Sequence, residues 1–113
     1  MAALKEIQLP RLDGLRPTLE STALKLMEEA GELGAAIGKV RGMSGERDGR
    51  SDDAVMRHVA LELLDVAQTA VTMMFVLEES HDVSVAEALD EHMQKLLRKG
   101  YLTVRSGQEN TRD

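Results

Sequence analysis

The sequence predicts an all-α fold, and three observations support this prediction. Hydrophobic residues make up 42% of the 113 residues but aromatic residues only 2%, so the apolar content is mainly Leu, Ala, Val and Met, which favour helices over strands. Three long segments carry helix start and stop signals. The length suits one domain and is too short for two independent cores. We therefore expect an antiparallel bundle of three long helices, with a short extra helix at residues 3–8.

The first long helix is predicted at residues 18–41, between the sequence "RPT" and a stop signal at Gly42. Apolar residues recur there at 3.6-residue spacing, which predicts a stripe that faces the core. The stripe consists of Leu19, Ala23, Leu26, Met27, Ala30, Leu33 and Ile37. The glycine-rich segment 42–53 follows this helix, and we expect it to be the most mobile part of the chain.

The second long helix is predicted to run from Asp52 or Asp53, either of which caps it, to about Ser80. Between residues 55 and 77 apolar side chains occupy nearly its whole circumference, and a helix that is apolar all round must be buried all round. Two partner helices in so short a chain cannot cover it. We therefore predict a homodimer or homotetramer in which another subunit packs on Met73, Met74, Phe75 and Val76.

The third long helix is predicted to begin at a capping box formed by Ser84 and Glu87 and to end at the sequence "LLRKG". The single domain then covers residues 18–100, between an N-terminal arm (1–17) and a polar C-terminal tail (101–113). The N-terminus has no apolar core of signal-peptide length, and we expect no segment to approach the roughly 20 apolar residues that a membrane span requires. We therefore expect a cytoplasmic protein that does not bind membranes.

Charge and residue content restrict the function. A net charge of −6 and a pI near 5.1 argue against nucleic-acid binding, which depends on clustered Lys and Arg. The absence of Cys excludes disulfides and thiolate metal sites, and three His residues supply a zinc site poorly. Any bound metal is therefore expected to be a hard cation held by oxygen atoms.

Two acidic pairs with a spacing of three residues are the main candidate site. Glu29 and Glu32 belong to the first predicted helix, and Glu62 and Asp65 lie inside the apolar second helix. Because the two helices are expected to be antiparallel neighbours, both pairs can face one gap. Two like charges about 4 Å apart repel by roughly 4 kcal/mol at an effective dielectric near 20, so converging carboxylates need protons or cations. All-oxygen ligands favour magnesium, with manganese as the alternative ion, and magnesium commonly takes substrate phosphates as further ligands.

These acids also carry a family resemblance. The sequence "EEAGE" at 28–32, followed by "ELLD" at 62–65, resembles the EExxE and ExxD signature of the MazG-like all-α nucleoside triphosphate pyrophosphohydrolases, and the similarity covers about residues 18–100. The resemblance implies a MazG-like helical bundle that hydrolyses a nucleoside triphosphate to the monophosphate and pyrophosphate. It also implies a division of roles, in which Glu28 orients or deprotonates the attacking water and magnesium is bound by Glu29, Glu32, Glu62 and Asp65.

The same resemblance bears on phosphate and base recognition. Members of the family use basic residues of the last core helix on the phosphates, which suggests Lys95 and Lys99, and Lys39 lies on the acidic side of the first helix. A lysine in such a position is more often simply a solvated cation near a helix end. The sequence does not match the aromatic base pocket of the better-defined family members, because Phe75 and Tyr101 are its only aromatic residues. The preferred base therefore stays open.

Two other functions fit parts of the pattern. A di-iron carboxylate bundle requires two Glu-x-x-His motifs, and only Glu78 with His81 provides one. A non-catalytic helical module that binds nucleotide, metal or another protein would use the acids and the Met-rich helix as binding surfaces. Magnesium binding that is lost in Glu62→Ala would favour the enzyme over the module.

Overall fold

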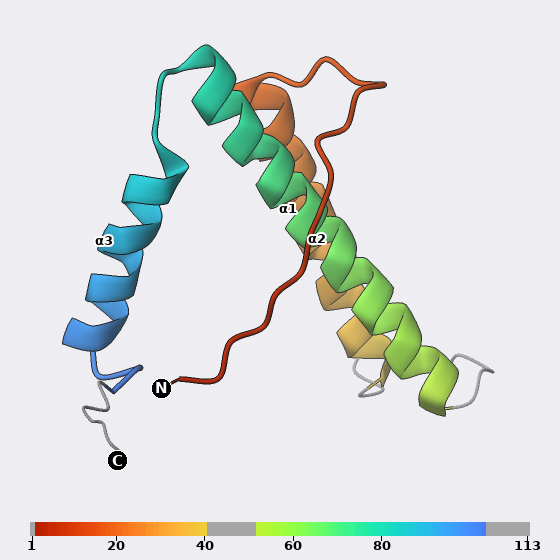
Figure 1. The fold of residues 1–113 in the computed structure, drawn as a ribbon. Coiled ribbons are helices and arrows are strands. Elements are labelled where there is room, and N and C mark those ends of the chain that lie inside the picture. The colour runs from red at the N-terminus through yellow and green to blue at the C-terminus, as the bar shows by residue number, and fades with distance from the viewer. Residues whose placement is uncertain (1, 41–51, 104–113) are drawn as a thin grey trace.

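The computed structural model in Figure 1 describes residues 2–40 and 52–103. These residues form three α-helices and no strand: α1 (Leu19–Val40), α2 (Asp52–Ser80) and α3 (Val85–Arg98). The predicted all-α class is confirmed, and the three long helices lie close to their predicted ranges. Asp52 and Asp53, predicted as caps of the second helix, lie in the first turn of α2. The predicted stop at Gly42 and most of the glycine-rich segment lie outside the described residues.

The helix ends follow from local side-chain bonds. At the start of α1 the N–H of Ser21 donates to Oγ1 of Thr18 (3.0 Å) and the N–H of Thr18 donates to Oγ of Ser21 (2.9 Å). Ser84 accepts a bond from the N–H of Glu87 at the start of α3 (3.1 Å), which confirms Ser84 as its N-cap. Gly100 then ends α3 at φ 77°, in the left-handed region that favours glycine.

Helices α1 and α2 lie side by side and antiparallel, and they form the main contact of the chain (Figure 1). The α1 side of this contact, called the seam below, alternates spacings of three and four residues. It consists of buried or half-buried Leu19, Thr22, Leu26, Glu29, Leu33 and Ala36. The prediction was wrong for Met27, Ala30 and Ile37, which are exposed. A single partner helix covers only a narrow strip of α1, so the margins of a wider apolar stripe stay in solvent.

The core is small and unusually polar. Among the described residues, only Ala36 and Val76 are buried apolar side chains, and no large side chain is fully buried. The hydroxyl of Thr22 donates to the carbonyl of Thr18 (2.8 Å), and that of Thr69 donates to the carbonyl of Asp65 (3.0 Å), so both are satisfied within their own helices. Because Val76 is buried within the chain itself, the prediction that another subunit covers it was wrong.

Helix α3 contacts α2 near the turn that joins them and makes no contact with α1 in the described part of the chain. Figure 1 shows its far end diverging from the α1–α2 pair. The radius of gyration is 18.2 Å, compared with about 13 Å for a compact domain of this length. One chain therefore does not close the three-helix bundle that the sequence predicts.

Helix α2 keeps a large apolar surface in solvent. Met56, Leu63 and Met74 are 55%, 53% and 41% exposed, and their spacings of seven and eleven residues place them on one side of the helix. By length and composition alone, α2 is long and apolar enough to cross a membrane, which corrects the prediction that no segment reaches that threshold. The core helix of a soluble protein passes the same test.

Residues 2–17 form an extended arm and contain no helix, which corrects the helix predicted at residues 3–8. A helix of six residues has too few hydrogen bonds to offset the cost of its first turn. Pro10 and Pro17 also disfavour the helical conformation in the residues before them. The arm instead runs across the α1–α2 pair (Figure 1).

Candidate metal centre

Three carboxylates from the two long helices meet at one place. Glu29 and Glu32 of α1 and Glu62 of α2 each contribute an oxygen atom, and the three atoms lie within 4.8 Å of one another. Glu29 occupies a position of the seam and is only 9% exposed, whereas Glu62 is half-buried and Glu32 is exposed. The structure therefore brings together three of the four acids that the sequence predicts as ligands.

The negative charge of this acidic cluster is only partly neutralised by a nearby cation. The Nζ atom of Lys25 lies 3.6 Å from Oε2 of Glu29 and 3.1 Å from Oε1 of Glu28. The pKa of Glu32 is raised, first because its side chain shares a hydrogen bond with Glu29 and then because Glu29, Glu62 and Glu28 repel its charged form. Lys25 thus pairs with two carboxylates, Glu28 and the buried Glu29.

A divalent cation fits this donor set. A buried carboxylate is costly unless it is paired, and the positively charged partner of Glu29 stands at the long end of ion-pair distance. The cluster offers oxygen ligands alone, which suit Mg²⁺ or Mn²⁺. Glu29, Glu32 and Glu62 are therefore the residues that would hold the metal.

The other two predicted acids stand apart from the cluster. Asp65 is exposed and is not one of the three converging carboxylates, although it lines the same cavity as Glu29. The side chain of Glu28 is 60% exposed and is held by Lys25 on the flank of α1. A metal ligand role for Asp65 and a proton-accepting role for Glu28 both stay predictions.

The three predicted phosphate-binding lysines lie in two different regions. Lys39 follows Glu32 by seven residues on α1, which puts it two turns away, about 10 Å along the same side of the helix. Lys95 and Lys99 lie at the far end of α3, which diverges from the helices that carry the acids (Figure 1). Of these three lysines, only Lys39 shares a helix side with the cluster within one chain.

A cavity of about 500 Å³ adjoins the acidic cluster. Its walls come from the arm, through Leu12, Leu15 and Pro17, and from the facing sides of α1 and α2. Glu29 and Asp65 line it at the acidic end, and Lys25 lines it nearby. The volume falls in the range of about 300–1,000 Å³ that is usual for small-molecule sites.

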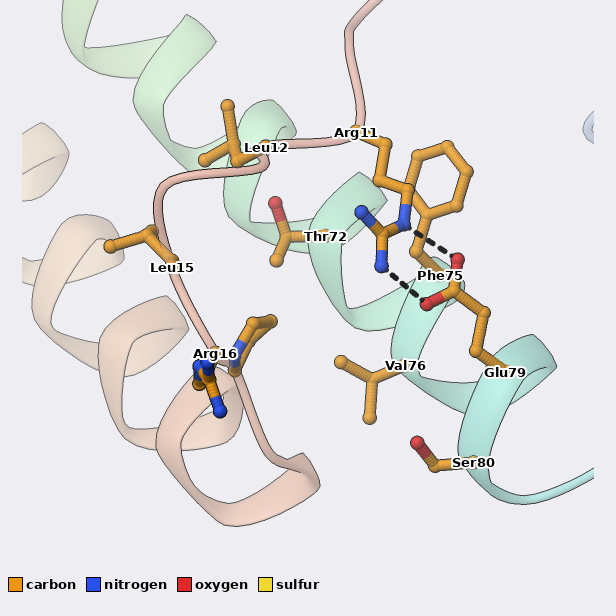
Figure 2. Close-up of a pocket in the computed structure, with 10 residues that line it drawn as sticks. Arg11, Leu12, Leu15, Arg16, Thr72, Phe75, Val76, Glu79 and Ser80 are labelled. Carbon is orange, nitrogen blue, oxygen red and sulfur yellow. Dashed lines mark hydrogen bonds and ion pairs between the residues drawn. The ribbon is translucent and has the colours of Figure 1, made fainter.

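Two long-range contacts tie the arm to α2. Arg11 donates from Nε and from its terminal nitrogen to the two carboxylate oxygens of Glu79, at 2.7 and 2.9 Å, as Figure 2 shows. Gln68 donates from Nε2 to the carbonyl of Pro10 (2.9 Å). A second, smaller cavity of about 290 Å³ lies beside the Arg11–Glu79 pair, with Phe75 on its wall.

The arm, Lys25 and Gln68 were not predicted as parts of a site. The two prolines of the arm could have signalled an extended segment. Nothing local in the sequence indicates that Arg11 meets a residue 68 positions later.

Comparison with sequence families decides the class of the protein. A family model described as the MazG nucleotide pyrophosphohydrolase domain matches residues 17–100. The chain belongs to this family. Comparison with curated proteins and with solved structures gives no match.

The MazG match contains the helices that carry both acidic pairs and all of α3. The family resemblance read from the sequence is therefore confirmed. The arm lies almost entirely before the matched residues, so the cavity beside the acids is built from the MazG domain and a segment outside it.

Proposed function

We propose that this MazG protein is a magnesium-dependent nucleoside triphosphate pyrophosphohydrolase. It cleaves its substrate between the α and β phosphates and releases the nucleoside monophosphate and pyrophosphate. The observation that carries the proposal is the acidic cluster, in which a buried seam position holds a carboxylate and two further carboxylates converge on it. An apolar residue at Glu29 would stabilise the helix pair better, so the acid has a use other than packing.

The side chains have separate roles in this reaction. Glu29, Glu32 and Glu62 hold Mg²⁺, and Asp65, at the edge of the adjoining cavity, is the proposed fourth ligand. When bound, the ion neutralises charge on the transferring phosphoryl group and lowers the pKa of a coordinated water. Glu28 accepts the proton of the attacking water. For this role the ion pair between Lys25 and Glu28 must break.

Lys39 is the residue proposed to bind the β and γ phosphates, which leave as pyrophosphate. It lies on the acid-bearing side of α1, on the opposite side of the cluster from the arm. Lys95 and Lys99 join the phosphates only in an assembly that brings α3 of another copy to the cluster. A phosphate chain placed between the metal and Lys39 would meet positive charge along its whole length.

Incubation with a panel of standard and modified nucleoside triphosphates and Mg²⁺ tests the reaction. The expected products are the monophosphate and pyrophosphate, identified by chromatography and by a pyrophosphate assay. A diphosphate with inorganic phosphate would contradict the proposed cleavage position. Glu78→Gln, which changes an exposed acid near the end of α2, serves as a matched control for charge removal.

We also propose that the protein is a homodimer or homotetramer. The exposed side of α2, the exposed Leu24 and Met27 of α1, and the uncovered α3 together leave more apolar surface than a stable monomer usually shows. A closed, symmetric assembly buries the same surfaces on every subunit and so removes them from water.

Sedimentation tests this assembly. The wild-type protein is expected to keep a dimer or tetramer mass on dilution to low micromolar concentration. Leu63→Glu, which introduces charge on the exposed side of α2, should shift the mass towards the monomer. A wild-type protein that is monomeric at all concentrations would contradict the proposal.

A non-catalytic module that binds metal or nucleotide is the second candidate. It is favoured by one observation: Glu28 is paired with Lys25 and is not one of the three converging carboxylates. Calorimetry with Mg²⁺ and a nucleoside triphosphate, combined with the product assay, separates the two. Tight binding without turnover across the panel would favour the module.

A further inference from the structure

The cavity beneath the arm adjoins the acidic cluster. Glu29 lines the cavity and also belongs to the cluster, so the two sites share this side chain. Thr22, at the arm end of the cavity, precedes Glu29 by seven residues, which corresponds to about 10 Å along α1. On the antiparallel α2, Gln68 follows Glu62 by six residues and so lies at the same end as Thr22. This spacing suits a ligand whose charged end meets the acids while an uncharged end fills the cavity.

The cavity has an apolar wall on the arm and a polar wall on the helices. Leu12, Leu15 and Pro17 of the arm form the apolar wall, and the helix residues that line the cavity are all polar or charged, among them Gln68, Thr69 and Thr72. No aromatic residue of the described ranges lines it, so a ring bound there would lie against the aliphatic side chains of the arm and would not stack on an aromatic face. Such walls accept a flat, moderately polar ring and leave its discrimination to hydrogen bonds.

Gln68 is the side chain that can discriminate. The carbonyl of Pro10 can only accept, so it fixes the amide nitrogen of Gln68 towards the arm at 2.9 Å. The same nitrogen lies 3.4 Å from Oγ1 of Thr72. The amide oxygen has no hydrogen bond to any residue of the described ranges, and Gln68 lines the cavity. The arm thus holds Gln68 with an acceptor left for a ligand.

We propose that the cavity holds the nucleoside part of the substrate, with Gln68 as a specificity-determining residue that accepts a hydrogen bond from the base and is oriented by Pro10 of the arm. This inference rests on the proposed pyrophosphohydrolase function for the identity of the charged end. Bases with an amino or imino donor on the edge that meets Gln68 are favoured over analogues that present an acceptor there. The arm, which lies outside most of the matched MazG segment, therefore takes part in base selection.

The decisive experiment measures binding and turnover separately in Gln68→Leu. Calorimetry uses nucleoside monophosphates as probes for the cavity and inorganic triphosphate, with Mg²⁺, as a probe for the acidic cluster alone. We expect the affinity for the preferred monophosphate to fall by about fivefold to tenfold, the usual effect of one lost hydrogen bond, while the affinity for triphosphate changes less than about twofold. In steady-state kinetics KM should rise more than kcat falls, and the ranking of bases should change.

A pair of neighbouring glutamates supplies a matched control for the arm. Glu79→Gln removes the partner of Arg11 and should weaken monophosphate binding for every base alike, whereas Glu78→Gln, one residue away and outside the cavities, should not. A Gln68→Leu protein with an unchanged base ranking and unchanged monophosphate affinity would overturn the inference, as would equal losses for monophosphate and triphosphate.

The two proposals fail in different ways. If no triphosphate is hydrolysed but monophosphate binding still depends on Gln68, the hydrolase proposal is lost and the cavity assignment is supported. If triphosphates are hydrolysed and Gln68→Leu leaves the ranking of bases unchanged, the hydrolase proposal is supported and the cavity assignment is lost.

Discussion

The acidic cluster and the N-terminal arm lie on the same groove of the α1–α2 pair, but different interactions build them. The cluster comes from spacings within two helices, where residues three apart lie on neighbouring positions of one face. The arm has no secondary structure and is held by contacts between residues 58 and 68 positions apart. The cluster is therefore a consequence of helix geometry, whereas the arm depends on the folded state as a whole.

This difference predicts that the two regions respond to different changes. The cluster concentrates negative charge. Removing one of its charges or supplying a cation should therefore have large effects on stability and activity. The arm is attached by exposed groups, since the side chains of Arg11 and Glu79 are 54% and 45% exposed. Changes there should be smaller and confined to the arm and its cavity.

The largest effect is expected from Glu62→Gln. The substitution keeps the shape of the side chain but removes one of the three converging carboxylates. Pyrophosphate release should fall at least about 100-fold, and Mg²⁺ should no longer raise the melting temperature. Without Mg²⁺ the variant should melt higher than the wild type, because repulsion within the cluster is relieved. A Glu62→Gln protein that retains Mg²⁺-dependent activity would rule out this cluster as the metal centre.

Addition of Mg²⁺ to the wild-type protein should stabilise it. At a free concentration about 100 times Kd, binding to the folded state alone contributes roughly 2.7 kcal/mol, or an increase in Tm on the order of 10 °C. Thermal unfolding followed by circular dichroism measures this increase in Tm, and removal of Mg²⁺ with EDTA should reverse it. The same titration in Glu78→Gln should give the wild-type shift, and a flat response in the wild type would count against metal binding.

A smaller and local effect is expected from Arg11→Gln, which removes the bidentate bond to Glu79. Hydrogen exchange should become several-fold faster in residues 8–16 and stay unchanged in the middle of α1. Arg98→Gln on α3 is the control, since it removes the same charge away from the arm. Faster exchange throughout α1 would mean that the arm contributes to the stability of the helix pair.

The smallest effect concerns pH. The hydrogen bond and charge of Arg11 hold the pKa of Glu79 below its ordinary value near 4.5. Its contribution to stability is therefore fully present above that ordinary value and is lost as the pH falls through the lowered pKa. Urea unfolding of the wild type and Glu79→Gln at several pH values between 3 and 7 should show a difference that disappears at the acid end. A difference that persists at pH 3 would assign the stabilisation to something other than the ion pair.

The cluster was predictable in outline because its information is local. The spacing of the acids and the apolar character of α2 predicted that Glu29, Glu32 and Glu62 face one gap, and the structure brings them within reach of one ion. The place of Asp65 was not predictable in the same way. A three-residue spacing allows a shared face, but the rotation of α2 in the seam leaves Asp65 exposed at the cavity edge.

The sequence by itself determined the all-α class, the helix ends and the acid spacing, since caps and 3.6-residue periodicity act over a few residues. The tertiary structure decided which of two adjacent glutamates enters the seam: Glu29 is buried and Glu28 is turned to Lys25. It also decided that the arm is extended and covers a cavity. These outcomes depend on contacts between distant residues, whose formation must offset the entropy of closing long loops, and no local pattern encodes that balance.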